Sequence, residues 1–219
     1  MSEGAPRSSS TRANAPVVRR PNARGAARRE ALIDAAVRLF SERGFRGTGI
    51  IGLAKEVGMT HAGLLHHFGT KEGLLHAVVA TRDEHFAEVL RTAGNGRGLD
   101  TTDAVLVAGQ QFVADPQLSR LFTVLIGENL MAENPLNGLF RERYRTLRKC
   151  VASALRAGQV DGTVDPDADA EGVAAEVVAF LLGLQSEHLL DPDAVDVVAV
   201  CAGYARRLRA SLAVPATPA

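Results

Sequence analysis

The sequence predicts an all-α protein. Apolar residues recur at helical spacing along most of the chain, and no segment shows the strict alternation that is typical of a β-strand. Alanine, valine and leucine are abundant, whereas aromatic residues make up only 5% of the chain and tryptophan is absent. A chain of 219 residues is long enough for one large domain or two small domains with a buried core.

Residues 1–25 are predicted to form a disordered basic arm. They are rich in serine, alanine, proline and arginine and have no periodic apolar pattern. Two interpretations remain open for this arm: a solvated tail, or a segment that follows DNA phosphates or the minor groove.

A first helix is expected from about Ala26 to Arg43. Gly44 is expected to end this helix, and Phe45 is expected to fold back onto its apolar face. That face carries Leu32, Ile33, Ala36, Val37, Leu39 and Phe40.

The stretch from Thr48 to Lys71 predicts two short helices joined by a tight turn. Gly58 stands where the first of them would end in the left-handed conformation, which costs glycine little. Thr60 is then expected to cap the second helix, and Leu64 to anchor it inward. The outer face of that second helix shows Thr60, His61, Ala62 and His66, which are small or able to form hydrogen bonds. This pattern is typical of a helix-turn-helix that reads the DNA major groove.

The rest of the chain is expected to contain further helices. A long helix capped by Thr70 should run from Lys71 to about Arg91, followed by a glycine-rich loop at 92–100 and a helix at about 102–114. Four pairs then place a capping side chain before a proline, which predicts helix starts near 116, 135, 166 and 192. These pairs are Asp115-Pro116, Asn134-Pro135, Asp165-Pro166 and Asp191-Pro192.

Charge is distributed unevenly although the net charge is zero. Residues 1–71 hold twelve arginines and lysines against five acidic residues, and the remainder is acidic to the same extent. A basic front half on an acidic rear half is expected of a DNA-binding domain with a separate partner domain.

The pattern from Leu32 to Val79 resembles the DNA-binding domain of the tetracycline-repressor (TetR) family of bacterial regulators. The matching pieces are the first helix ending in RGF, the segment LAKEVGMT, and HHFGTKEGLL passing into a long helix. The resemblance implies a helix-turn-helix DNA-binding domain at 26–72, a larger helical ligand-binding and dimerisation domain at 73–213, and a short tail at 214–219.

The same resemblance assigns DNA-contacting residues. It implies that Lys71 binds a phosphate at a helix N-terminus, that His67 reaches the DNA backbone, and that Thr48 caps a helix and touches phosphate. Gly63 and Leu65 depart from the family pattern of threonine or serine and of tyrosine, so Leu65 can offer only apolar contact. The expected DNA-binding set is Thr48, Thr60, His61, Ala62, Gly63, Leu65, His66, His67 and Lys71.

The rear domain would then have two tasks, dimerisation and ligand sensing. Apolar stripes on the last two helices predict a four-helix bundle across a two-fold axis, although they could instead complete the core of one chain. The expected interface residues are Val177, Leu181, Leu184, Val197, Cys201, Tyr204 and Leu208. The candidate ligand contacts are His85, Phe86, Phe112, Phe122, Leu125, Asn129, Gln185 and His188. They contain no cluster of like charge, which favours an uncharged, largely apolar ligand.

Other functions find little support in the sequence. There is no glycine-rich phosphate loop and no GxSxG motif, so an enzyme is not expected. The six histidines include no HxxxH pair and the two cysteines form no CxxC, so neither a metal site nor a cofactor is expected. No apolar secretory signal and no run as long as a membrane span is recognised, so a cytoplasmic protein is expected.

The predicted function is therefore a ligand-responsive transcriptional regulator. It would repress by binding a pseudo-palindromic operator as a homodimer, and a small molecule would release it. The alternative is a DNA-binding regulator without a small ligand, whose rear domain only dimerises or recruits a protein.

Overall fold

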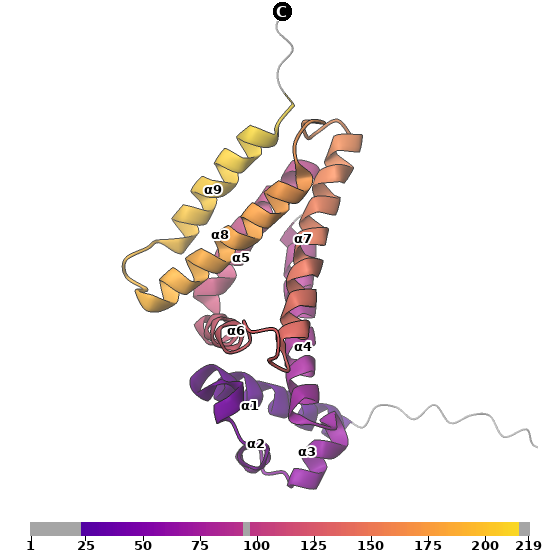
Figure 1. Cartoon of the computed structure of the whole chain (residues 1–219), viewed down its shortest axis with the longest axis vertical. Coiled ribbons are helices and arrows are strands. Elements are labelled where there is room, and N and C mark those ends of the chain that lie inside the picture. The colour runs from indigo at the N-terminus through magenta and orange to yellow at the C-terminus, as the bar shows by residue number, and fades with distance from the viewer. Residues whose placement is uncertain (1–22, 94–96, 215–219) are drawn as a thin grey trace, which may run out of the picture.

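The computed structural model describes residues 23–93 and 97–214, and every regular element within them is helical (Figure 1). The predicted basic arm lies almost wholly outside the described residues, apart from its last three, which are helical.

The N-terminal part of the chain is a three-helix domain followed by a long connecting helix. Its elements are α1 (Ala23–Gly47), α2 (Ile50–Glu56), α3 (His61–Phe68) and α4 (Lys71–Ala93). Within α1, Gly44 has φ 72° and ψ 173°, so the continuous helix ends there as predicted. The Phe45 ring lies 5.5 Å from that of Phe40, which places it back on the apolar face of α1.

The rear part consists of a short 3-10 helix and five α-helices. They are η1 (Gly98–Thr102), α5 (Asp103–Ala114), α6 (Pro116–Glu128), α7 (Asn137–Val160), α8 (Ala170–Leu190) and α9 (Val197–Leu212). In Figure 1, α6 lies between the N-terminal domain and the remaining rear helices, while α4 and α7 run together up one side.

The apolar core crosses the boundary between the two domains. Leu64 of α3 and Leu75 and Val78 of α4 belong to the same buried cluster as Leu121 and Leu125 of α6. A second cluster fills the rear domain between η1 and helices α5, α7, α8 and α9. Since α6 packs along α1, the three-helix N-terminal domain is joined to the rear domain by shared core as well as by α4.

Only one of the four predicted proline-based helix starts is correct. Asp115 accepts a hydrogen bond from the Leu118 N–H at 2.8 Å, and α6 begins at Pro116. The other three Asx-Pro pairs form turns, and α7, α8 and α9 begin two to five residues after each proline. The caps that start α8 and α9 are Asp169 and Asp196, whose carboxylates accept from backbone N–H groups three residues further on. A carboxylate cap does not need a following proline, so the Asx-Pro pattern located the turns and not the helices.

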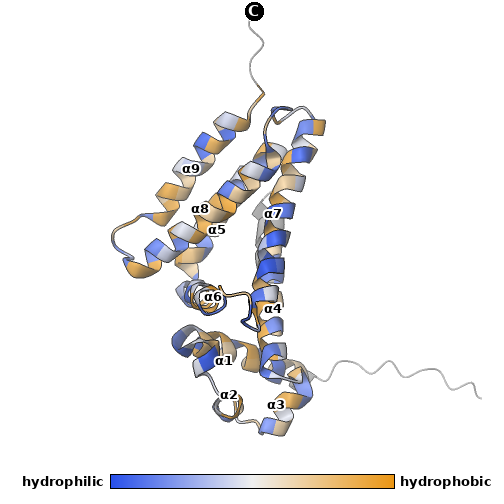
Figure 2. Cartoon of the chain, viewed as in Figure 1, coloured by the Kyte–Doolittle hydropathy of each residue, from blue (hydrophilic) through white to orange (hydrophobic). Residues whose placement is uncertain are grey.

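Helix α8 is more apolar than the sequence analysis allowed. Among the described residues, α8 is the one helix whose length and composition would suffice for a membrane span. Figure 2 shows it as a largely apolar helix. It packs against α5, α6 and α7 and buries Ala174, Val178 and Leu184 there, but only 28% of its apolar window is buried within one chain.

Candidate functional site

The turn between α2 and α3 is built as the sequence predicts. Gly58 has φ 64°, and Thr60 in extended conformation accepts a hydrogen bond from the Gly63 N–H at 3.1 Å. Leu64 is fully buried beneath the short helix. These three features hold α3 at a defined angle to α2, which a reading helix requires.

The outer face of α3 is free of intrachain packing. His61, Ala62, His66 and His67 are exposed, and Leu65 is half-buried. His67 lies between its neighbours, with ring centroids 5.9 Å from His66 and 6.2 Å from Phe68. The face therefore presents imidazole groups that can donate hydrogen bonds to base edges or accept them, together with the small side chain of Ala62.

Thr48 does not have the role that the resemblance assigned to it. Its side chain is buried and its hydroxyl oxygen lies 2.8 Å from the Gly44 carbonyl oxygen and 3.1 Å from that of Leu39, to which it donates. Gly49 precedes α2, and no side chain caps this helix. A hydroxyl committed to the end of α1 is not available to a phosphate, so the predicted cap and contact by the Thr48 side chain are wrong.

Lys71 stands at the N-terminus of α4, as predicted. Thr70 caps that helix through the Gly73 N–H at 2.9 Å. The Lys71 ammonium lies 4.1 Å from the centre of the Phe45 ring, and partial burial lowers the pKa of Lys71. A cation that is partly dehydrated against an aromatic face at a helix N-terminus remains suited to a phosphate oxygen.

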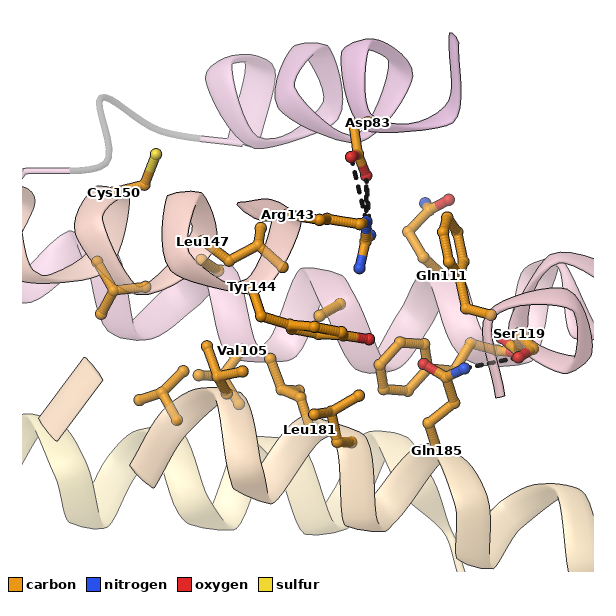
Figure 3. A pocket seen from close by; sticks show the side chains of 18 of the residues that line it. Asp83, Val105, Gln111, Ser119, Arg143, Tyr144, Leu147, Cys150, Leu181 and Gln185 are labelled. Atoms are coloured by element: carbon orange, nitrogen blue, oxygen red, sulfur yellow. Dashed lines mark hydrogen bonds and ion pairs between the residues drawn. The ribbon is translucent and has the colours of Figure 1, made fainter. Parts of the chain in front are cut away.

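A cavity of about 200 Å³, partly open to solvent, lies between α4 and the rear helices α5, α6, α7 and α8 (Figure 3). Its walls are mainly apolar. Of the predicted ligand contacts, Phe112, Phe122 and Gln185 line it. Leu125 and Asn129 are buried elsewhere, and His188 is not part of the wall. The side chains of His85 and Phe86 lie outside the described part of the chain.

Apart from Gln185, the polar part of the cavity wall was not predicted from the sequence. The Arg143 guanidinium donates to both carboxylate oxygens of Asp83, at 2.8 to 3.1 Å, and stacks over the Phe122 ring at 4.1 Å. Tyr144 extends across the cavity beside this pair (Figure 3), and burial raises its pKa. Gln185 donates to the Ser119 carbonyl at 2.6 Å.

One sequence signal could have revealed part of this wall. Along α7, apolar and aromatic side chains recur every three or four residues at Phe140, Tyr144, Leu147, Val151 and Leu155, which places them on one inward face. No such pattern links Arg143 to Asp83, because the two lie sixty residues apart on different helices.

Most of the predicted interface residues are buried inside one chain. Cys201 is 0% exposed because its sulfur packs onto Gly109 of α5, where a Cβ would come within 2.5 Å of it. Val197, Leu184 and Leu208 are also buried in the rear core. Val177 and Leu181 line the cavity instead. The interface prediction is wrong for the five buried residues, because their surface is already covered within the chain. Leu181 is only partly buried, so its interface role stays a prediction.

Tyr204 remains accessible among the predicted interface residues. It stacks on Phe180 of α8 at 4.0 Å between nearly parallel rings, and both side chains are half-buried. Desolvation, with a further contribution from Glu176, raises the pKa of Tyr204. Beside this aromatic stack, Gly183 of α8 and Val200 of α9 are exposed.

Metal ligands do not gather in this structure. No group of three or more histidine, cysteine or acidic side chains suited to a metal ion occurs within residues 23–93 and 97–214 where side chains are described.

Two family profiles match the chain. Residues 32–78 match "Bacterial regulatory proteins, tetR family", and residues 115–212 match "BetI-type transcriptional repressor, C-terminal".

Relatives of known name share the same class. The chain is 25% identical over 184 residues to the HTH-type transcriptional regulator UidR of Escherichia coli K12, covering 84% of this chain and 90% of the relative. It is 28% identical over 152 residues to the HTH-type transcriptional repressor KstR2 of Rhodococcus jostii, covering 66% and 71%. The fold matches the solved structure described as "SmeT-Triclosan complex" with a TM-score of 0.71 and 24% identity, covering 88% of this chain and 98% of that one.

Proposed function

Because the chain belongs to the TetR family of bacterial transcriptional regulators, we propose that it is a ligand-responsive repressor that binds a pseudo-palindromic operator as a homodimer. The matched proteins are regulators and not enzymes. One observation carries the proposal: a chain with an exposed reading helix also holds a largely apolar cavity, and α4 contributes to both regions.

The exposed face of α3 supports the DNA-binding part of the proposal. His61 and His66 stand free on this face and can contact base edges, while Ala62 lets the helix lie close to the groove floor. Lys71 at the start of α4 is placed to hold a phosphate. The basic composition of residues 1–71 would add attraction that does not depend on sequence.

A homodimer follows from the small size of one reading head. A single helix-turn-helix reads few base pairs, and two heads related by a two-fold axis would read two half-sites about 34–36 Å apart, or a multiple of that spacing. The surface around the Phe180–Tyr204 stack, with the exposed residues Gly183 and Val200, is an accessible part of α8 and α9 that a second copy could contact. Small residues there would let helices of the two subunits approach closely.

Repression and release by a small molecule are the finer parts of the proposal. Repression is supported by the BetI-type repressor profile and by the name of KstR2, and ligand binding by the cavity and by the SmeT complex with triclosan. A ligand that favours a different separation of the two heads must weaken DNA affinity, and DNA must weaken ligand affinity by the same factor. The cytoplasm is the compartment that this function requires.

The cavity also weighs against a regulator without a small ligand. Such a protein would need its rear domain only for dimerisation, and a partly open, mainly apolar cavity of about 200 Å³ would then leave apolar side chains unpacked without benefit.

The test is a search for a pseudo-palindrome upstream of the gene for this protein and of neighbouring genes, followed by footprinting on that DNA. We expect two protected half-sites at the spacing of a dimer. The Ala62→Glu variant should lose this protection, because a carboxylate on the reading face adds bulk and repels phosphates. Protection that persists in Ala62→Glu, or a single protected half-site, would contradict the proposal.

A further inference from the structure

The cavity wall contains one cation that its neighbours do not neutralise inside the cavity. The charged residues that line it are Arg82, Asp83 and Arg143. Arg143 and Asp83 satisfy each other through three hydrogen bonds, the shortest 2.8 Å. A bidentate pair of this kind leaves little charge for a third group. Arg82 is therefore the lining cation whose carboxylate partner, Asp34, does not line the cavity.

The guanidinium of Arg82 is only partly satisfied. Its Nη2 donates to Asp34 of α1 at 3.1 Å, and the Asp34 side chain is 63% exposed, so water screens this ion pair. Its Nε is buried and has no hydrogen-bond partner among the described residues. A buried donor without an acceptor costs free energy, and that cost ends when a ligand supplies the acceptor.

The rest of the wall defines the other end of the ligand. Phe112, Phe122, Leu147 and Leu181 surround the space with apolar surface, and the volume is about 200 Å³. This volume is below the usual range of drug-binding pockets, so the ligand must be small. The mainly apolar walls favour a ligand whose surface is mostly hydrocarbon.

We propose that the effector is a small apolar carboxylate whose head group pairs with the guanidinium of Arg82. This inference rests on the proposed ligand-responsive function and replaces the uncharged ligand that the sequence favoured. The reason for the change is Arg82, which the sequence pattern did not place in the cavity wall and whose Nε is buried without a partner among the described residues.

The same arginine connects the ligand to the DNA-reading domain. Arg82 lies on α4, and its partner Asp34 lies on α1 of the helix-turn-helix domain. A ligand carboxylate and Asp34 then share the guanidinium charge of Arg82. Each therefore weakens the interaction of the other with Arg82. Binding of the carboxylate loosens this link between α4 and α1, and removal of Asp34 strengthens ligand binding.

The experiment compares matched probes that differ only in the head group. Octanoate, 1-octanol and octylamine form one series, and 2-naphthoate and 2-naphthol form a second, aromatic series. Binding to the full-length protein is measured by calorimetry at pH 7.5, where both carboxylates are ionised. A charge-assisted hydrogen bond predicts that each carboxylate binds about tenfold or more tightly than its alcohol, and that octylamine binds most weakly.

Two variants connect this preference to Arg82. Arg82→Gln should remove the advantage of the carboxylates while leaving the alcohols within about twofold. Asp34→Asn should raise carboxylate affinity several-fold and leave the alcohols unchanged. Arg120→Gln is the matched control, because Arg120 is an exposed arginine of α6 that does not line the cavity.

The outcomes separate this inference from the proposed function. Alcohols that bind as tightly as the carboxylates, or a carboxylate preference that survives Arg82→Gln, overturn the inference and leave a ligand-binding regulator. If Arg82→Gln fails to fold, the Asp34→Asn variant decides the question. An unchanged carboxylate affinity in Asp34→Asn overturns the coupling to Arg82. Absence of binding by every probe overturns the inference, whereas DNA protection lost in Ala62→Glu still supports the DNA-binding part of the function.

Discussion

The carboxylate of Glu128, at the end of α6, accepts a hydrogen bond from the backbone N–H of Phe45 at 2.7 Å. This contact joins the rear domain to the turn that follows the long first helix. Asn134 extends it, because its side chain bonds the Glu128 carbonyl at 2.8 Å and the Arg46 guanidinium at 2.6 Å. The end of α6 therefore holds the segment that leads into the helix-turn-helix.

Replacing Glu128 by alanine should destabilise the protein. The change removes the acceptor of the partly buried Phe45 N–H, and an unsatisfied donor of this kind costs roughly 1–3 kcal/mol. Urea unfolding of the variant should show a lower midpoint. Glu133→Ala, which removes an exposed carboxylate from the neighbouring loop, is the control and should be neutral. Equal midpoints for both variants would mean that the Glu128 contact has no energetic weight.

Gly44→Ala should be more damaging than an ordinary glycine substitution. Gly44 has φ 72° and ψ 173°, a backbone region that side chains disfavour, and a Cβ there would lie 2.1 Å from Glu128 Oε1. We expect a loss of more than about 1 kcal/mol in unfolding free energy. Gly127→Ala, in helical conformation on α6 with no atom near its Cβ, should instead stabilise by about 0.5–1 kcal/mol. Thermal unfolding of the two variants tests this difference in sign.

Alanine substitutions should separate sequence reading from phosphate binding. His61→Ala and His66→Ala should each cost roughly 1–3 kcal/mol on the operator and much less on random DNA, because their imidazoles face base edges. Lys71→Ala should weaken both DNAs by similar factors, since a phosphate contact carries no sequence information. Titrations against operator and scrambled duplexes at one salt concentration provide the comparison. If the histidine variants lose affinity equally for both DNAs while Lys71→Ala lowers only the affinity for the operator, then Lys71 reads sequence and the histidines bind phosphate.

Gly183→Arg should convert a dimer into monomers. The position is exposed on α8, beside the Phe180–Tyr204 stack, and an arginine there would place a long cation in the proposed contact between copies. Gly138→Arg on the exposed start of α7 is the matched control. Light scattering after size exclusion gives the mass of each. Cys201→Arg should unfold the rear domain instead of separating subunits, because Cys201 is fully buried against α5.

The two cysteines should differ sharply in reactivity. Cys150 is exposed, whereas Cys201 is buried and its pKa is raised by burial to about 11. A raised pKa keeps the thiol protonated at neutral pH, and the thiolate is the reactive form. A colorimetric disulfide reagent at pH 7.5 should label one thiol rapidly in the native protein and the second only after denaturation. Rapid labelling of the one remaining thiol in native Cys150→Ser would place Cys201 at the surface.

The helices of the DNA-reading domain followed from local sequence. Gly44, Gly58 and Thr60 act through the conformation of their own backbone or through a hydrogen bond three residues away, so the residue type alone predicted their roles. The same local logic failed for Thr48, because its hydroxyl found acceptors at the end of the preceding helix.

The contacts within the rear domain could be assigned only from the tertiary structure. A stripe of apolar residues on α8 or α9 shows that a helix buries one face, but not whether the covering surface belongs to the same chain or to a second copy. Packing of α9 on α5 decided that question for Cys201, through the space left by Gly109. The cavity was decided in the same way, because Arg143 meets Asp83 across sixty residues and Arg82 meets Asp34 across forty-eight. Periodicity shows which face of its own helix a side chain occupies. Which residue that side chain contacts is determined only when the helices pack together.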